Sequence, residues 1–380
     1  MGEQKRDLAL FVTATFFIYA FTTVYYLFAS FLEGQGRGSA AVGLLISAYY
    51  VTVSVIRPFG GWMTEQMGVR KTLVAAGLIA AVGGLLPLGD PSTARLLLAR
   101  VVTGVGFGSY CVALTSLQCL VVPDRLRGST FAMTTIGSIA PLFLVIPVAD
   151  GLLQRGLFTA YLIEAPLLAL AAATMAFFLP DREDGACVTR PAWGSYGQLF
   201  AQSGMKLLLL SAFAFAVTDS AIVYVANLAG AKGLSASPFI AISGVAALVV
   251  RLLGRNLMDR LPRRKLAGPS FGLMALALLW ASAAGNRTGL ALAGALFGAG
   301  LGVAFPVHLA LVGDLAPAEL RPKGTAMVYL AQDLSWMGLP LFIGFTSPLL
   351  GLPGAFRALA GFALAASVAL TLFWKRPSRA

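Results

Sequence analysis

Charged residues, histidine and cysteine are all scarce in this chain of 380 residues. Asp, Glu, Lys and Arg make up 12% of it, roughly half the share that is usual in a soluble domain. Because 58% of the residues are hydrophobic, the composition excludes a disordered protein and argues against a water-soluble enzyme. The chain has one histidine and no H-E-x-x-H motif, and its three cysteines form no C-x-x-C or Cys/His cluster. We therefore expect no metal site, no disulfide framework and no cofactor.

What the chain has instead is a series of long apolar blocks, such as Leu8–Leu32 and Leu207–Val225. A helix needs about 20 apolar residues to cross a bilayer, and these blocks are too long and uniform for the alternating strands of a membrane barrel. The sequence therefore predicts an all-α polytopic membrane protein with twelve transmembrane helices. Their predicted ranges are 8–32, 40–63, 72–89, 94–120, 128–149, 157–179, 206–230, 236–258, 266–284, 288–312, 323–349 and 353–374.

One long polar stretch, from Pro180 to Ser203, separates the first six predicted helices from the last six. We expect an N-terminal bundle over 1–180, a linker over 181–205 and a C-terminal bundle over 206–380. Of the basic residues, 19 lie on the side of the termini and 6 on the opposite side. The positive-inside rule then places both termini and the linker in the cytoplasm, and the protein in the cytoplasmic (inner) membrane. The same distribution accounts for the net charge of +12 without a nucleic-acid partner.

The two halves repeat the same chemistry at a constant offset of 194 residues. Glu65 maps to Asp259, and matches of arginine, proline and spaced glycine are not expected by chance at a single offset. The two halves are therefore predicted to be parallel repeats, an architecture with a midplane binding site and alternating access. The matched pairs include Arg57 and Arg251, Gly60 and Gly254, Arg70 and Arg264, Lys71 and Lys265, Gly104 and Gly298, Gly106 and Gly300, Gly108 and Gly302, Pro123 and Pro317, and Arg127 and Arg321.

Three segments carry a resemblance to the major facilitator superfamily. Gly61–Lys71 resembles the family's loop motif of a glycine, an acid four residues later, then a glycine and a basic run. A second copy, Gly254–Lys265, has a proline in place of the second glycine. The fourth predicted helix is similar to the family's L-x-x-x-R-x-x-x-G-x-G pattern, with the residues Leu96, Arg100, Gly104, Gly106 and Gly108. The resemblance implies two pseudo-twofold-related six-helix bundles and secondary transport by alternating access.

By the same resemblance, the carboxylates of the two loop motifs are expected to act as a cytoplasmic gate. In this interpretation, each acid pairs with a loop arginine and holds the outward-open state closed on the inside. The alternative is a solvated turn that only obeys the positive-inside rule. The candidate gate residues are Glu65, Arg70, Lys71, Asp259, Arg263 and Arg264.

Charges inside the predicted helices are the strongest candidates for function, because each costs roughly 2.5–3.5 kcal/mol at a helix centre on insertion scales. Asp219 and Asp333 fall near the midplane, and with Glu164 they are the candidates for proton coupling. Arg100 and Glu164 fall at matching depth, so they could pair with each other. His308 is either a packed polar residue or a proton relay.

Polar and aromatic residues at suitable depths are candidates for substrate binding. Tyr25 and Trp336 could equally face lipid headgroups. The full set is Tyr25, Arg100, Tyr110, Asn227, His308, Tyr329, Gln332 and Trp336.

We expect a proton-coupled exporter, an antiporter of a small metabolite, a drug or an opine-type metallophore. Its partners would be the small-molecule substrate, protons and the lipid bilayer, and a monomer is expected. The pair Arg57-Pro58 resembles the bacterial efflux branch of the family. Two alternatives stay open: an importer of a small organic anion or nutrient, with Arg100 holding a carboxylate, and a non-transporting sensor. The G-x-S-x-G match at Gly268–Gly272 begins a predicted membrane helix instead of following a strand, so an enzyme is not expected.

Overall fold

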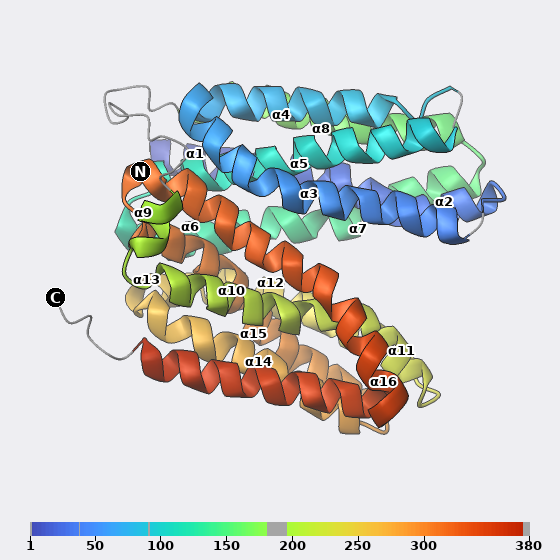
Figure 1. Cartoon of the computed structure of the whole chain (residues 1–380), viewed down its shortest axis with the longest axis vertical. Helices are drawn as coiled ribbons and strands as arrows, with labels where there is room; N and C mark the ends of the chain where they lie inside the picture. Colours follow the sequence, from blue (N-terminus) through green and yellow to red (C-terminus); the bar gives the residue numbers. More distant parts are fainter. Residues whose placement is uncertain (1, 38, 90–91, 181–195, 375–380) are drawn as a thin grey trace. The chain divides into compact units, whose positions relative to one another are not determined.

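The computed structural model describes residues 2–37, 39–89, 92–180 and 196–374, and over these ranges every regular element is helical (Figure 1). This confirms the all-α prediction. The chain forms two compact units by its internal contacts. Unit 1 comprises 1–121, 134–195 and 318–326, and unit 2 comprises 122–133, 196–317 and 327–380. Most of the polar linker lies outside the described residues.

Unit 1 is built from the helices of the first half of the chain. In it, α3 and α4 pack on α5, α4 also packs on α8, and α1 packs on α7 and α8. A short 3-10 turn, Tyr25–Leu27, interrupts the first predicted helix. The helices are α1 (Gly2–Val24), α2 (Phe28–Gly34), α3 (Ser39–Met67), α4 (Val69–Leu85), α5 (Thr93–Val121), α7 (Ile136–Gln154) and α8 (Phe158–Met175).

Unit 2 repeats this packing with the helices of the second half. Here α12 and α14 pack on α15, and α10 packs on α14 and α15. A 3-10 turn, Ala221–Tyr224, interrupts the seventh predicted helix at nearly the same place in the repeat. The helices are α6 (Arg127–Thr134, most of which belongs to this unit), α9 (Tyr196–Ala201), α10 (Met205–Ser220), α11 (Val225–Gly230), α12 (Ser237–Leu253), α13 (Leu257–Arg260), α14 (Arg263–Ala283), α15 (Arg287–Leu315) and α16 (Arg321–Phe373), whose first residues, 321–326, belong to unit 1.

Over the described ranges, nine helical stretches are long and apolar enough to cross a membrane. Two shorter apolar helices, α4 and α12, have 17 residues each. The last helix, α16, has 53 residues and contains a non-helical residue, Gly351, with φ 68°, so it is long enough for two passes. Together these elements fit the twelve predicted passes.

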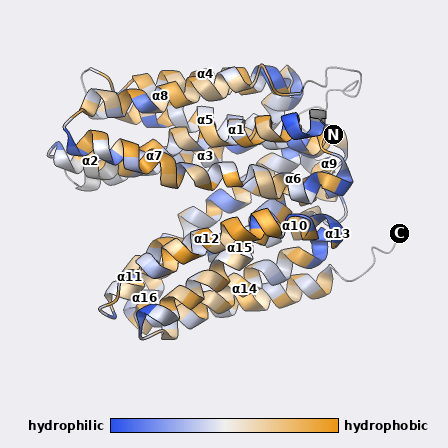
Figure 2. Ribbon diagram, turned by 180° about the vertical axis from the view of Figure 1, so that it is seen from behind, coloured by the Kyte–Doolittle hydropathy of each residue, from blue (hydrophilic) through white to orange (hydrophobic). Residues whose placement is uncertain are grey.

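Hydrophobic residues predominate along the helices (Figure 2), and many large ones are exposed. Leu253, Phe345 and Leu349 are 75–83% exposed. Soluble monomeric proteins rarely expose large contiguous apolar patches. Such an apolar surface is suited to contact with lipid tails. Helices can lie among lipid tails because each helix satisfies its backbone polar groups internally.

Matched glycines let helices approach closely at the same place in both units. A Cβ on Gly106 would lie 2.7 Å from the carbonyl oxygen of Ala76, and one on Gly300 would lie 2.4 Å from that of Ser270. Ala76 and Ser270 are themselves separated by the repeat offset. The two units therefore pack their central helices, α5 and α15, in the same way.

This packing predicts opposite effects for two glycine substitutions in unit 2. Gly300→Ala should lower the free energy of unfolding by about 1–3 kcal/mol, because the new methyl group meets a backbone carbonyl that cannot move aside. Gly361→Ala is the control, since nothing lies within 4 Å of its Cβ position, and it should raise stability by about 0.5–1 kcal/mol. Thermal unfolding of the purified variants measures both, and equal stability of the two would contradict the close approach.

Candidate functional site

The buried charges of unit 1 begin with Arg100, which is 4% exposed on α5. Its guanidinium carbon lies 4.3 Å from the ring centre of Tyr49 and 4.7 Å from that of Tyr25. Its Nε donates a hydrogen bond of 3.3 Å to the carbonyl oxygen of Leu45, while Nη1 is buried without a hydrogen-bond partner. Such cation–π contacts are worth about 0.5–2 kcal/mol, which offsets only part of the cost of the buried charge.

Glu164 of α8 does not form the ion pair with Arg100 that matching depth suggested. Within the described ranges no nitrogen–oxygen contact of 4.0 Å or less joins the two side chains, and Glu164 Oε2 is buried without a partner. Depth along a helix fixes height but not direction, since successive side chains turn by about 100° around the axis. Tyr110, another candidate, donates a 2.7 Å hydrogen bond from α5 to the carbonyl oxygen of Ala172 on α8, which gives it a structural role.

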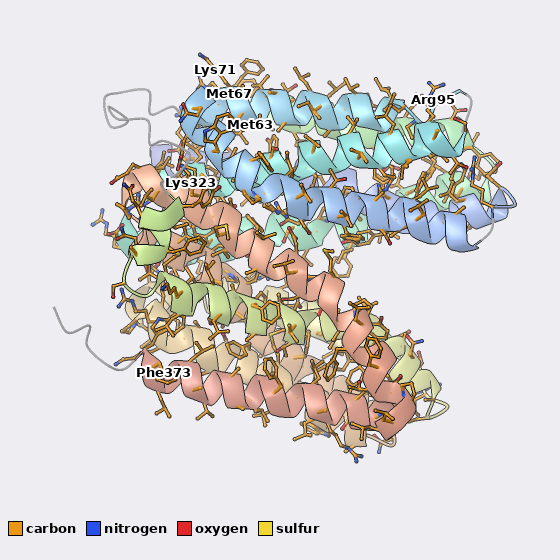
Figure 3. All side chains as sticks on the ribbon, in the orientation of Figure 1. Met63, Met67, Lys71, Arg95, Lys323 and Phe373 are labelled. Atoms are coloured by element: carbon orange, nitrogen blue, oxygen red, sulfur yellow. The ribbon has the colours of Figure 1, made fainter. Side chains whose placement is uncertain are left out.

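The gate candidate of unit 1 is Glu65, at the end of α3. Its ion-pair partner is Lys323 in the first turn of α16 (Figure 3), instead of the expected Arg70, whose Nη2 donates to the carbonyl oxygen of Leu179. Glu65 is 6% exposed and Lys323 is 0% exposed. Lys71 lies on the surface. Sequence analysis missed Lys323, which it counted only as a basic residue of the cytoplasmic side.

In unit 2 the matching acid, Asp259, belongs to a wider network around Arg263. Arg263 donates to both carboxylate oxygens of Asp314, at 2.8 and 2.9 Å, and to Asp259 at 3.2 Å. Arg127, which is 1% exposed, forms ion pairs with Asp314 and Asp124. Arg264 lies on the surface.

The gate contacts of the two units are related by the repeat offset of 194 residues. Asp259 accepts a 3.1 Å hydrogen bond from the backbone nitrogen of Ser129, and the repeat mates of this pair are Glu65 and Lys323. Each carboxylate therefore contacts the same position at the start of a helix from the other half of the sequence. The offset alone could not have identified Lys323, because only the structure shows its mate, Ser129, beside Asp259.

The coupling candidate Asp219 is half-buried near the end of α10. Its carboxylate makes no hydrogen bond or ion pair with the described part of the chain. Arg251 is 1% exposed and lies 5.9 Å from the ring centre of Phe305. Phe305 in turn contacts Phe215, one turn before Asp219.

His308 is fully buried in unit 2 and both of its ring nitrogens are occupied. Nδ1 lies 2.7 Å from the carbonyl oxygen of Ala304, so Nδ1–H donates, and Nε2 then accepts the 2.7 Å hydrogen bond from Ser211. The ring stacks on Phe215 at 5.1 Å. This arrangement satisfies a neutral imidazole and favours the packed polar residue over the proton relay.

The histidine arrangement gives a direct test with Ser211→Ala. The change leaves a buried acceptor without its donor, so we expect the free energy of unfolding to fall by about 1–3 kcal/mol. The pH dependence of transport should stay as in the wild type. A shifted pH profile with unchanged stability would instead favour a proton relay through His308.

The remaining candidates of unit 2 are spread over α11 and α16. Asn227 is exposed on α11, Asp333 is half-buried and Trp336 is 38% exposed. Tyr329 is buried, and Gln332 has a buried Nε2 without a hydrogen-bond partner. Of the residues proposed from sequence, Arg100 and Tyr25 are in direct contact, as are Asp259 and Arg263.

The sequence also matches a known protein family and known proteins. A family model described as Major Facilitator Superfamily matches residues 10–260 and 208–380. The protein named "Putative multidrug resistance protein MdtD" of Escherichia fergusonii is 28% identical over 226 residues, which cover 58% of this chain and 43% of that relative. The match thus spans less than half of the relative's length.

Solved transporter structures share the fold. The E. coli fucose:proton symporter FucP has a TM-score of 0.80 at 16% identity, over 97% of this chain and 98% of that chain. The human organic anion transporter MFSD10 (TETRAN) has a TM-score of 0.79 at 15% identity, over 96% and 99%. At these identities the likeness concerns the fold alone.

Proposed function

Because the chain belongs to the Major Facilitator Superfamily, we propose that it is a proton-coupled exporter of a small metabolite, a drug or an opine-type metallophore. It works as a monomer in the cytoplasmic (inner) membrane, with both termini in the cytoplasm. Similarity to a multidrug resistance protein supports export, and the uneven distribution of basic residues supports the orientation.

Asp219 is the observation that carries the proposal. A proton-driven exporter needs a group that binds a proton in one state and releases it in the other. Asp219 has no ion-pair partner within the described ranges, and Arg251 contacts Phe305, which packs on Phe215 one helix turn before Asp219. A carboxylate without an ion-pair partner can change its protonation state when its exposure or its distance to a cation changes.

The gate contacts supply the conformational part of the proposal. The pair of Glu65 with Lys323 and the network of Asp259 with Arg263 act as cytoplasmic latches that stabilise one of the two states. Release of these contacts favours the other state, and a proton or substrate shifts the balance only through its different affinity for the two states. The alternative interpretation, a solvated turn, does not suit Lys323, which is fully buried.

The direction of coupling can be tested in proteoliposomes that hold an acidic or an alkaline lumen. Cationic dyes, opines and organic acids serve as probes. An antiporter accumulates its substrate when the lumen is acidic, because protons leave as substrate enters. A symporter accumulates it when the lumen is alkaline, which would support the anion importer that the unpartnered Nη1 of Arg100 favours. Binding without flux under either gradient would identify a sensor and overturn the transport proposal.

A further inference from the structure

Arg100 is a buried cation that is surrounded by aromatic rings and forms no ion pair with a carboxylate in the part of the chain that the structure describes. Three aromatic rings surround the guanidinium, those of Tyr49, Tyr25 and, at 5.7 Å, Phe28. The rings cover its faces, and the backbone of Leu45 takes Nε. Nη1 is left buried and unpartnered, so one edge of the group lacks the acceptor that a buried guanidinium requires.

Unit 1 also contains a carboxylate with a buried oxygen that lacks a hydrogen-bond partner. Glu164 Oε2 is buried without a hydrogen-bond partner. Glu164 follows Tyr161 by three residues on α8, so the two side chains lie on the same face of that helix. Tyr161 reaches the residue before Tyr25, whose ring lies over the guanidinium of Arg100. The hydroxyl of Tyr161 is already used, since it donates a 3.0 Å hydrogen bond to the carbonyl oxygen of Val24. Tyr161 therefore cannot donate to Glu164.

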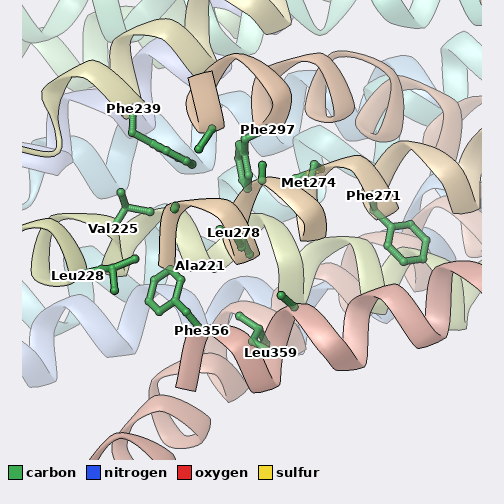
Figure 4. Packing of buried hydrophobic residues seen from close by; sticks show 14 of the residues in the cluster. Ala221, Val225, Leu228, Phe239, Phe271, Met274, Leu278, Phe297, Phe356 and Leu359 are labelled. Carbon is green, nitrogen blue, oxygen red and sulfur yellow. The ribbon is translucent and has the colours of Figure 1, made fainter. Parts of the chain in front are cut away.

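Unit 2 shows that the fold does not need these charges. The repeat mates of Arg100 and Glu164 are Gly294 and Ala358. A Cβ on Gly294 would lie 2.4 Å from the carbonyl oxygen of Phe239, the mate of Leu45. There the space is closed by direct helix packing and by the ring of Phe297, 5.4 Å from that of Phe239 (Figure 4).

We propose that Arg100 and Glu164 are the two charged ends of a binding site for a zwitterion. The carboxylate of the ligand accepts from Arg100 Nη1, its ammonium group donates to Glu164 Oε2, and its apolar part contacts the ring of Tyr25. This proposal rests on the proposed transport function, since it names the substrate class. The two charged hydrogen bonds supply the missing partners of both protein groups.

Simpler ligands fit these two groups less well. An anion alone would satisfy Arg100 and leave Glu164 buried without a donor. A cation alone, or a proton on Glu164, would leave Arg100 without an acceptor. A zwitterion satisfies both and brings no net charge into the membrane, where net charge is costly.

The test measures binding to the purified full-length protein in detergent, without any pH gradient. The probes are L-phenylalanine and a series of ω-amino carboxylates from glycine to 8-aminooctanoate, so that the separation of the two charges is varied. Matched analogues carry one charge only, with the amine acetylated or the carboxylate converted to an amide. We expect at least one zwitterion to raise the apparent melting temperature, because it binds only the folded state, and to bind about tenfold or more tightly than both of its blocked analogues.

Variants then assign each charge to its residue. Arg100→Gln should weaken the zwitterion by about tenfold or more and leave no preference over the amide analogue. Glu164→Gln should leave no preference over the acetylated analogue. The control is Arg95→Gln, an exposed arginine on the same helix, which should bind as the wild type does.

Three results would overturn the proposal: no probe binds, a blocked analogue binds as tightly as its zwitterion, or Glu164→Gln keeps the preference. These outcomes do not test proton-driven export. That proposal is tested by measuring flux in vesicles with imposed gradients. A protein that binds zwitterions but does not couple to protons would retain this inference and lose the coupling mechanism.

Discussion

Asp219→Asn should abolish substrate accumulation against a gradient while leaving the protein folded and able to bind its ligand. One pH unit is worth about 1.4 kcal/mol, or a tenfold ratio. For an exchange of one proton per substrate at zero membrane potential, a difference of two units can therefore sustain accumulation of about a hundredfold in the wild type. An asparagine cannot titrate, so the variant should equilibrate its substrate without accumulation.

The assay is uptake into proteoliposomes with an acidic lumen, beside direct binding by the same preparation. Glu319→Gln is the matched control, because Glu319 is an exposed carboxylate and its loss should leave accumulation intact. If Asp219→Asn still accumulates substrate, the coupling group is to be sought at Asp333 and then at Glu164. If neutral variants of all three still respond to the gradient, proton antiport is the wrong mechanism.

Arg251 makes this prediction more specific. The aromatic contacts of Phe305 with Arg251 and Phe215 bring its charge to the helix turn before Asp219. Replacing Arg251 by Gln should therefore make Asp219 harder to deprotonate. The optimum of proton-driven uptake should move to higher pH, because a more alkaline medium is then needed to release the proton. An unchanged profile would show that Arg251 serves packing alone.

The helices and the repeat could be predicted because their signals are local or periodic. Runs of apolar residues mark the passes, and the constant offset aligns Gly106 with Gly300, whose contacts with Ala76 and Ser270 prove to be equivalent. The 3-10 turn at Tyr25–Leu27 could not be predicted, because it lies inside an uninterrupted apolar run.

Side-chain partners were harder to predict than helices. Arg100 and Glu164 share a depth in the sequence pattern, yet the rotation of their helices keeps them from pairing. The partner of Glu65 was missed for a different reason. Lys323 is 258 residues away from it, and its basic side chain is equally explained by the positive-inside rule. The offset relates Lys323 to Ser129, but the contact of Ser129 with Asp259 is itself known only from the structure.

The pair of Glu65 and Lys323 leads to the second large effect. The first turn of α16 packs closely on α3, since a Cβ on Gly61 would lie 3.0 Å from the carbonyl oxygen of Pro322 and 3.2 Å from Lys323 Cα. Glu65 Oε1 is buried without a hydrogen-bond partner. Replacing Lys323 therefore leaves the carboxylate of Glu65 as an uncompensated charge at a buried position.

We therefore expect Glu65→Gln and Lys323→Met each to lower the free energy of unfolding by about 3–5 kcal/mol. The double variant should recover much of this loss, because it leaves no unpaired charge. Asp259→Asn is the control in the repeat: Arg263 keeps Asp314 as a partner, so the loss should be smaller. Thermal unfolding of the wild type and the four variants gives the comparison, and additive effects in the double variant would contradict a coupled pair.

A latch must also bias conformation, which stability alone does not report. Ala326 is fully buried, and its Cβ lies 2.9 Å from the Cβ position of Gly61, so Ala326→Cys in a background without the native cysteines reports on the contact of α3 with α16. Labelling by a membrane-impermeant maleimide should be slow in this protein and at least about tenfold faster once Glu65→Gln is added. A bias of 1.4 kcal/mol suffices for a tenfold change in population, well within the range expected for the broken pair. Equal labelling rates would mean that the ion pair stabilises unit 1 without gating it, and the cytoplasmic latch would then have to be assigned to Asp259 and its partners.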